Sequence, residues 1–354
     1  MPEQKKRIPW IDALRGLAII LMVPANLSPY FSEPHPMWFR ILGSFAAPTF
    51  IMLSAGMVVL TGDRHDERYY LKRGAIIIGI GMLLDILLWR IFPWTSFDVL
   101  YPIGLGLPLI YLLRRVDARE LLYISVIIFL ATYVLQVFFG YHAEPLEVYF
   151  DDMFAPSIGR ILQSWFIDGW FPVFPWIGYA VLGALFFRTL FRENSGVSNR
   201  FLMLGATLTA IGFALLFVPL PFVRNLADGA ILESRGGYSE IFYPPTFAYI
   251  FTSIGIVMLF SALLRRTKFF GVLTVLGFFG RYSMMVYILH QVIGALVIEP
   301  ATIAMGYESI TSGPWFTFVN LVVLGTIYAI CYGIERIKRR HRPESTVLQV
   351  LFGK

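Results

Sequence analysis

Two histidines, one of them inside an apolar segment, are the residues of this chain best suited to chemistry. His290 lies within a long apolar segment, and His35 lies between two prolines shortly after Asn26. A histidine inside a membrane-length apolar segment is costly to place and usually marks a functional site. Its imidazole titrates near neutral pH and can act as a general base or as a nucleophile. The pattern predicts chemistry done inside or across a membrane.

The composition of the chain indicates an integral membrane protein. Its 354 residues are 57% hydrophobic and only 15% charged, whereas soluble proteins average about 25% charged residues. The apolar residues form repeated runs of roughly 20 residues, the length that spans a bilayer. The single cysteine, Cys331, excludes an intramolecular disulfide and a cysteine metal cluster.

Ten apolar segments position these residues. We expect an all-α, polytopic membrane bundle of about ten transmembrane helices that forms one domain over residues 1–354. The spans are predicted at 12–30, 38–61, 73–92, 98–113, 121–140, 169–191, 201–220, 241–263, 269–298 and 314–335. The ninth segment is long, and we expect it to begin with a short separate segment at 272–280.

The placement of positive charge predicts the topology. If the N-terminus is cytoplasmic, most of the 29 Lys and Arg fall on cytoplasmic segments, as the positive-inside rule requires. We therefore place both termini in the cytoplasm and expect the chain in the plasma membrane of a cell. His35 is then expected in an exposed outer loop and His290 in the outer half of its span. Two long outer segments, 141–168 and 221–240, follow from the same topology. The net charge of +6 is interpreted as a topogenic signal that faces anionic lipid headgroups of the bilayer, not as a nucleic-acid patch.

Four segments, in order, resemble one family of membrane enzymes. Residues 11–26 (IDALRGLAIILMVPAN) resemble the N-terminal signature of the transmembrane acyltransferase clan. The closest resemblance is to the branch that contains heparan-α-glucosaminide N-acetyltransferase and its prokaryotic relatives. Residues 171–183 (FPVFPWIGYAVLG) and 243–255 (YPPTFAYIFTSIG) resemble two spans of that branch, and residues 280–290 (GRYSMMVYILH) resemble its late histidine helix.

The resemblance implies an activity and its residues. The family carries a catalytic histidine in the first outer loop, after an Asn at the end of the first span, which His35 and Asn26 match. His290 matches the histidine of the late helix. The implied reaction moves an acetyl group from cytoplasmic acetyl-CoA to a sugar or glycan amine or hydroxyl outside. The second span departs from the animal enzyme, which has an aspartate before a Phe-Pro pair. The corresponding residues 43–50 (GSFAAPTF) contain no aspartate.

Each candidate residue has an expected role. His35 is the general base or a covalent acyl carrier, and the sequence does not separate the two. Asn26 donates a hydrogen bond to the thioester carbonyl or holds an imidazole. Arg15 and Arg281 are expected to bind coenzyme A near the cytoplasmic face, with Asp12 as a partner of Arg15. No metal is expected in the reaction.

Other interpretations stay open. Asp85, within the third span, is costly unless paired, and is either a site residue or the partner of an Arg. A transporter or flippase would also hold polar residues in its spans. A membrane metalloenzyme is disfavoured because the sequence contains no HExxH motif and no evident carboxylate–histidine cluster. The identity of the acceptor, N- versus O-acetylation and a homodimer are left open.

Overall fold

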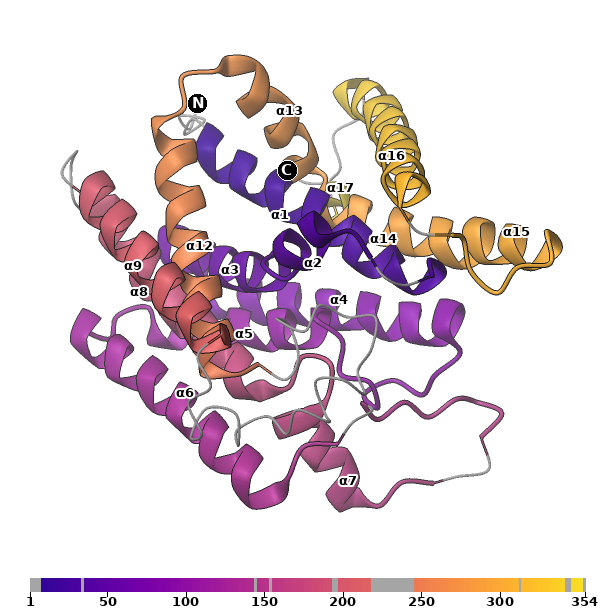
Figure 1. The fold of residues 1–354 in the computed structure, drawn as a ribbon. Coiled ribbons are helices and arrows are strands. Elements are labelled where there is room, and N and C mark those ends of the chain that lie inside the picture. Colours follow the sequence, from indigo (N-terminus) through magenta and orange to yellow (C-terminus); the bar gives the residue numbers. More distant parts are fainter. Residues whose placement is uncertain are drawn as a thin grey trace. The chain divides into compact units, whose positions relative to one another are not determined.

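Helices form nearly all of the described part of the protein. The computed structural model describes residues 8–32, 35–142, 145–152, 155–192, 197–217, 245–311, 313–340 and 345–352. Within these ranges the chain is 80% helical and contains no β-strand, as the ribbon in Figure 1 shows. The all-α prediction is therefore confirmed for them. The predicted outer segment 221–240 lies outside the described residues.

The chain divides into two compact units. The first unit consists of Met1–Thr49, Ser198–Ala206 and Gly255–Lys354, and the second of Phe50–Val197 and Thr207–Ile254. Three helices have residues in both units: α3 (Ala46–Thr61), α9 (Val197–Phe217) and α12 (Phe247–Arg266). One domain over residues 1–354 stays a prediction.

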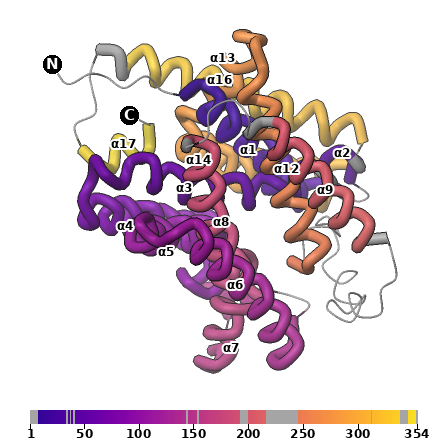
Figure 2. The backbone as a smooth tube through the Cα atoms, turned by 90° about the vertical axis from the view of Figure 1, so that its left-hand side faces the viewer, coloured from indigo at the N-terminus to yellow at the C-terminus, as the bar shows by residue number. Residues whose placement is uncertain are grey.

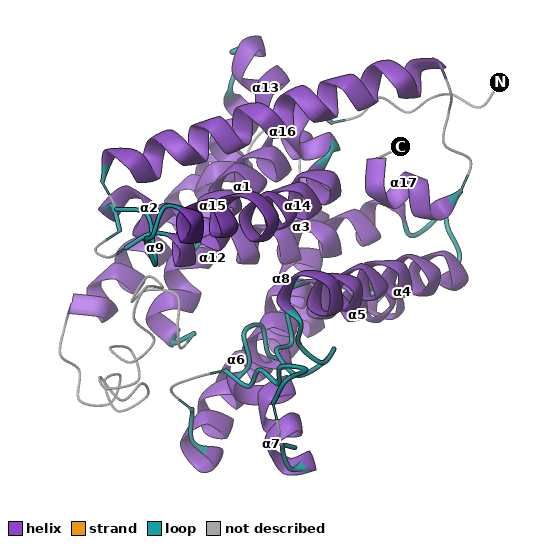
Figure 3. Cartoon of the chain, turned by 90° about the vertical axis from the view of Figure 1, so that its right-hand side faces the viewer, coloured by secondary structure: helices purple, strands orange, loops and turns teal. Residues whose placement is uncertain are grey.

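The first unit is built around the N-terminal helix α1 (Pro9–Leu27). This helix packs against α13 (Phe270–Arg281) and α14 (Ser283–Ile293), and α16 (Pro314–Arg340) lies against α1 and α14 (Figure 3). The remaining elements of this unit are η1 (Ser28–Tyr30), α2 (Met37–Gly43), the π-helical turn η4 (Gly294–Ile298), α15 (Glu299–Ala304) and α17 (Thr346–Phe352).

Two glycines allow the backbones of α1 and α13 to touch. A Cβ on Gly16 would lie 1.7 Å from the carbonyl oxygen of Leu276, and a Cβ on Gly280 would lie 1.9 Å from that of Asp12. No other residue type fits at either place. Small residues commonly bring membrane helices this close, and here they fix the position of Asp12 beside the end of α13.

The second unit contains two helix pairs. The first pairs α4 (Glu67–Leu84) with α5 (Leu100–Leu113), and the second pairs α6 (Ala118–Phe139) with α8 (Val173–Arg192), as Figure 2 shows. The start of α6 is fixed by a capping box between Asp117 and Glu120. The shorter elements are the π-helical turns η2 (Asp85–Trp89) and η3 (Ser164–Asp168) and the helix α7 (Ile158–Gln163).

The predicted spans coincide with helices, but not one for one. Six stretches of the described residues are long and apolar enough to cross a membrane: Pro9–Tyr30, Ala118–Phe139, Ile158–Phe191, Phe247–Arg266, Ser283–Ala304 and Pro314–Ile337. The predicted separate segment at the start of the ninth span is confirmed, because α13 ends at Arg281 and α14 begins at Ser283. The second predicted span is divided into α2 and α3. The ten-span count and the cytoplasmic termini stay predictions.

Candidate functional site

A partly buried hydrogen bond joins two of the predicted site residues in the first unit. Asn26 Nδ2 lies 3.0 Å from His290 Nε2, and the two residues are 264 positions apart in the sequence. Asn26 lies in the last turn of α1, and His290 lies in the last turn of α14. The histidine is fully buried. The fold therefore brings Asn26 and His290 together.

The partners of His290 define which ring nitrogen carries hydrogen. His290 Nδ1 lies 2.9 Å from the carbonyl oxygen of Val286, one turn earlier in α14. A carbonyl oxygen only accepts, so Nδ1 donates to it. Nε2 then accepts the hydrogen bond from the Asn26 amide. The pattern holds His290 as a neutral imidazole whose lone pair faces Asn26, and it orients the Asn26 amide in turn.

His35 is buried, contrary to the expected exposed loop. Its residue exposure is 8%, and its ring centroid lies 5.7 Å from those of Phe39 and Phe316. The prediction was wrong because the neighbouring prolines and Glu33 suggest a solvated turn. Phe316, which covers the ring, lies at the start of α16, far away in the sequence.

Hydrogen bonds hold the ring of His35 against the turn that follows Asn26. Its Nε2 lies 3.1 Å from the carbonyl oxygen of Ser28 and 3.3 Å from that of Phe31. Both partners only accept, so Nε2 carries hydrogen. The hydroxyl of Ser28 donates to the carbonyl oxygen of Ala25 at 2.8 Å, which fixes this turn directly beside Asn26.

The three predicted donor-binding residues gather at the other end of α1. Arg15 Nη1 lies 3.5 Å from Asp12 Oδ1, so the expected pair is present. Arg281 follows Gly280, whose Cα touches the backbone of Asp12. Arg281 Nη2 also lies 3.9 Å from Glu335 Oε1, an acidic partner that the sequence analysis did not identify. Both arginine side chains are partly exposed, at 24% and 31%.

The two groups of candidate residues lie at opposite ends of one helix. Arg15 and Asn26 are eleven residues apart on α1, which corresponds to about 16 Å along a helix axis. Polar groups with an amide and imidazoles lie at one end, and cationic groups lie at the other. A long substrate with an anionic end and a reactive end would suit this arrangement.

Asp85 in the second unit has a tyrosine as its partner. The carboxylate is buried, and it accepts a hydrogen bond from the hydroxyl of Tyr101. The sequence analysis expected either a site residue or a partner for an Arg. A phenol one element later satisfies the buried carboxylate instead, and the spacing of the apolar runs gives no signal for this pair.

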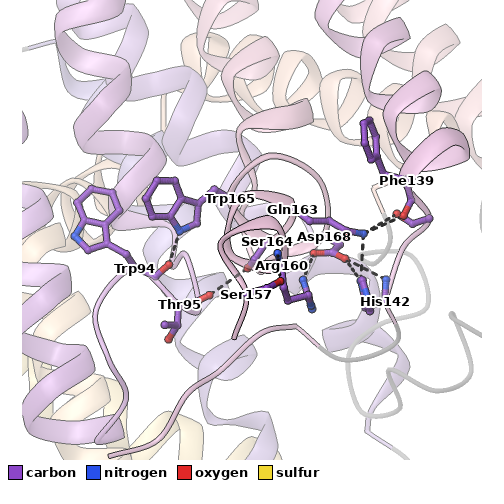
Figure 4. Close-up of polar contacts among 11 residues, drawn as sticks. Trp94, Thr95, Phe139, His142, Ser157, Arg160, Gln163, Ser164, Trp165 and Asp168 are labelled. Carbon is purple, nitrogen blue, oxygen red and sulfur yellow. Dashed lines mark hydrogen bonds and ion pairs between the residues drawn. The ribbon is translucent and has the colours of Figure 1, made fainter. Parts of the chain in front are cut away.

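A second polar cluster in the second unit was missed by the sequence analysis (Figure 4). The side chain of Asp168 is fully buried, and its Oδ1 accepts from Arg160 Nη1 at 2.8 Å. Its Oδ2 accepts from the backbone N–H of His142 at 3.2 Å and lies against Nδ1 of the same residue. The sequence contains no motif that predicts this carboxylate–histidine pair. Arg160 and His142 precede Asp168 by 8 and 26 residues. Only the folding of the connection between α6 and α8 therefore brings the three side chains together.

The acidic residues of segment 141–168, which is predicted to lie outside, differ in their surroundings. Glu147 accepts hydrogen bonds from the indole of Trp170 at 2.8 Å and from the hydroxyl of Tyr149 at 2.7 Å. Burial and the Glu147 carboxylate raise the pKa of the Tyr149 hydroxyl. Asp151 forms an exposed ion pair with Arg90.

Within the described ranges, no group of three or more His, Cys, Asp or Glu could hold a metal ion.

Comparison with known families gives the chain an identity. Residues 7–218 match the family described as heparan-alpha-glucosaminide N-acetyltransferase, catalytic. No curated protein matches the chain. The matched range is more than half of the sequence and contains Asp12, Arg15, Asn26 and His35, whereas Arg281 and His290 lie beyond it. Six apolar helices among the described residues are long enough to cross a membrane, and the chain is an integral membrane protein that belongs to the heparan-alpha-glucosaminide N-acetyltransferase catalytic-domain family.

Proposed function

We propose that the protein transfers an acetyl group from cytoplasmic acetyl-CoA to a sugar or glycan amine or hydroxyl outside a prokaryotic plasma membrane. Its family supports acetyl transfer in a membrane. The observation that carries the proposal is the hydrogen bond between Asn26 and the fully buried His290. It holds an amide donor and a neutral imidazole in a water-poor place, next to the turn that carries His35. In this proposal the bundle has ten spans and both termini are cytoplasmic.

The residues at the outer end of α1 can supply the chemistry of acyl transfer. The acceptor atom attacks the thioester carbonyl carbon, the carbon–sulfur bond breaks, and coenzyme A leaves. His35 takes the acceptor proton at Nδ1 and passes it to the leaving thiolate. Asn26 donates its second amide N–H to the carbonyl oxygen as negative charge develops there. His290 positions that amide through the hydrogen bond at 3.0 Å.

The residues at the other end of α1 suit the nucleotide end of the donor. Phosphates need cationic partners with N–H donors, and Arg15 and Arg281 lie on either side of the glycine contact between α1 and α13. The flexible pantetheine arm of coenzyme A would then follow α1 for about 16 Å, the rise of the eleven residues from Arg15 to Asn26.

The proposal is tested by measuring free coenzyme A thiol released by the purified protein from acetyl-CoA, with glucosamine as the acceptor. Removing a general base typically costs about 10²–10⁴-fold in rate. His35→Ala should reach that range, and Asn26→Ala and His290→Ala should also lower the rate strongly. His65→Ala is the matched control, because His65 stacks on Tyr69 in the second unit. Near-normal transfer by both His35→Ala and His290→Ala would refute the assignment.

One measurement distinguishes direct acetyl transfer from transfer through an acetyl group carried on His35. Brief incubation with radiolabelled acetyl-CoA and no acceptor labels the protein only if an acetyl-imidazole forms. In the covalent route the wild-type protein is labelled and His35→Ala is not. In the direct route neither is labelled, although turnover still depends on His35. Label retained by His35→Ala would contradict both routes for this residue.

A further inference from the structure

The hydroxyl of Tyr30 is a buried polar group that the protein leaves unsatisfied. Among the described residues it is one of the buried side-chain oxygens that have no hydrogen-bond partner. Burying a hydroxyl without a partner is unfavourable, and native structures rarely do so without a reason. The residue as a whole is of intermediate exposure. The hydroxyl is therefore the buried polar end of a residue that is partly exposed elsewhere.

Tyr30 lies one turn beyond the Asn26–His290 pair. It follows Asn26 by four residues, and its ring packs on Gly294, which follows His290 by four. A Cβ on Gly294 would lie 2.8 Å from Tyr30 Cε2 and 3.3 Å from its hydroxyl oxygen. The Asn26–His290 bond and the Tyr30–Gly294 contact are thus successive links between the ends of α1 and α14. They are separated by roughly 5.4 Å, one helical turn.

The surrounding backbone holds the phenol in place. The carbonyl oxygen of Tyr30 accepts from the N–H of Ile310 at 2.9 Å. Gly294 begins a π-helical turn, and its N–H bonds the carbonyl oxygens of His290 and Gln291. Such π-turns are frequent at functional sites. The ring needs Gly294 at this place, because any side chain there would displace it.

A second side-chain atom without a hydrogen-bond partner belongs to α16, the helix whose Phe316 packs on His35. Asn320 is buried, its Oδ1 has no partner, and its Nδ2 donates to the carbonyl oxygen of Phe316 at 2.8 Å. The ring of Phe316 packs on His35 and on Phe31, the residue after Tyr30. Asn320 Oδ1 and the Tyr30 hydroxyl are thus two buried polar atoms of the first unit that have no protein partner. Hydroxyl or amine groups of a substrate can form hydrogen bonds with atoms of both kinds.

We propose that the Tyr30 hydroxyl binds the acetyl acceptor by a hydrogen bond to one of its hydroxyl groups. This inference rests on the proposed function and adds a residue that positions the acceptor. In the proposed topology the acceptor arrives from the outer side, and Tyr30 lies on the outer side of the Asn26–His290 pair. The phenol then holds the acceptor one turn away from the reacting atoms, and Asn26 and His35 act on the atom that receives the acetyl group.

Tyr30→Phe tests the inference, because it removes only the hydroxyl and keeps the ring on Gly294. We expect the KM for glucosamine to rise roughly three- to tenfold, the loss of one neutral hydrogen bond, with the KM for acetyl-CoA unchanged. The Tm of the ligand-free protein should not fall, because the hydroxyl bonds no protein group. Tyr307→Phe is the matched control, since Tyr307 lies in the same unit and is 62% exposed.

The outcomes separate this inference from the function on which it rests. An unchanged glucosamine KM in Tyr30→Phe, with an active wild-type protein, would overturn the inference alone. A lower Tm with unchanged KM values would also overturn it, because it would show a purely structural hydroxyl. Absence of any transfer by the wild-type protein would overturn both this inference and the proposed function.

Discussion

Replacing Asp168 by Asn should destabilise the protein more than any other single change of an acidic residue in the outer connection. The carboxylate is fully buried and faces a guanidinium at 2.8 Å, a backbone N–H at 3.2 Å and the ring of His142. Breaking a buried ion pair by removing one charge costs about 3–5 kcal/mol. The side chains of Arg160 and His142 are 18% and 48% exposed, so water recovers part of the loss. The amide also keeps one oxygen to accept from Arg160. We therefore expect about 3 kcal/mol, the low end of that range.

The exposed pair of Arg90 and Asp151 supplies the matched control. Its atoms lie 3.2 Å apart, but the side chains are 67% and 82% exposed, and pairs of this kind contribute little to stability. Thermal unfolding in detergent should show a Tm lower by several degrees for Asp168→Asn and nearly unchanged for Asp151→Asn. Arg160→Ala should be destabilising as well, and less than additive with Asp168→Asn. Equal Tm values for the two Asp→Asn variants would refute the reasoning.

Two further predictions concern topology and the donor. In a Cys331→Ser background, single cysteines at Glu33 and Arg192 should react with an impermeant thiol reagent from opposite sides of the membrane; reaction from the same side would exclude the ten-span topology. Arg15→Ala should raise the KM for acetyl-CoA about tenfold or more, the loss of a charge-assisted hydrogen bond, and leave the KM for glucosamine unchanged. An unaltered acetyl-CoA KM would remove Arg15 from the donor site.

The helical segments could be predicted from the sequence, because each depends on a local run of apolar residues. The separate segment before His290 was also predictable, since the ninth apolar run was too long for one span. The burial of His35 was not predictable. It depends on Phe316, which lies on a helix near the other end of the chain. An exposed turn and a buried turn can have the same local sequence when the residue that buries the turn comes from a distant part of the chain.

The pairs that hold the candidate site are also non-local. No periodicity in the sequence relates Asn26 to His290, or Asp168 to His142, because each pair depends on how helices pack. The resemblance to a known family singled out Asn26 and His290 separately, and the fold joined them. It gave no indication of Asp168 or Tyr101, which satisfy buried groups in the second unit.

The segment from Leu276 to Gly294 contacts α1 near both of its ends. At the glycine contact, Gly16 meets Leu276 and Asp12 meets Gly280, so α13 runs antiparallel to α1. At the other end, Asn26 meets His290 and Tyr30 meets Gly294, so α14 runs parallel to α1. The chain therefore reverses its direction relative to α1 between Arg281 and Ser283, where the two helices are separated.

This reversal has a consequence for the proposed reaction. A single straight helix over 269–298 could not touch Asp12 with Gly280 and Asn26 with His290. Because it runs antiparallel to α1 at Gly280, it would place His290 about 15 Å farther along in that direction, away from Asn26. The break lets Arg281 remain at the cationic end of α1 while His290 reaches its amide end. The arginine proposed to bind the donor and the imidazole that bonds Asn26 are thus positioned by the same turn. A change at that turn should therefore alter donor binding and acetyl transfer together.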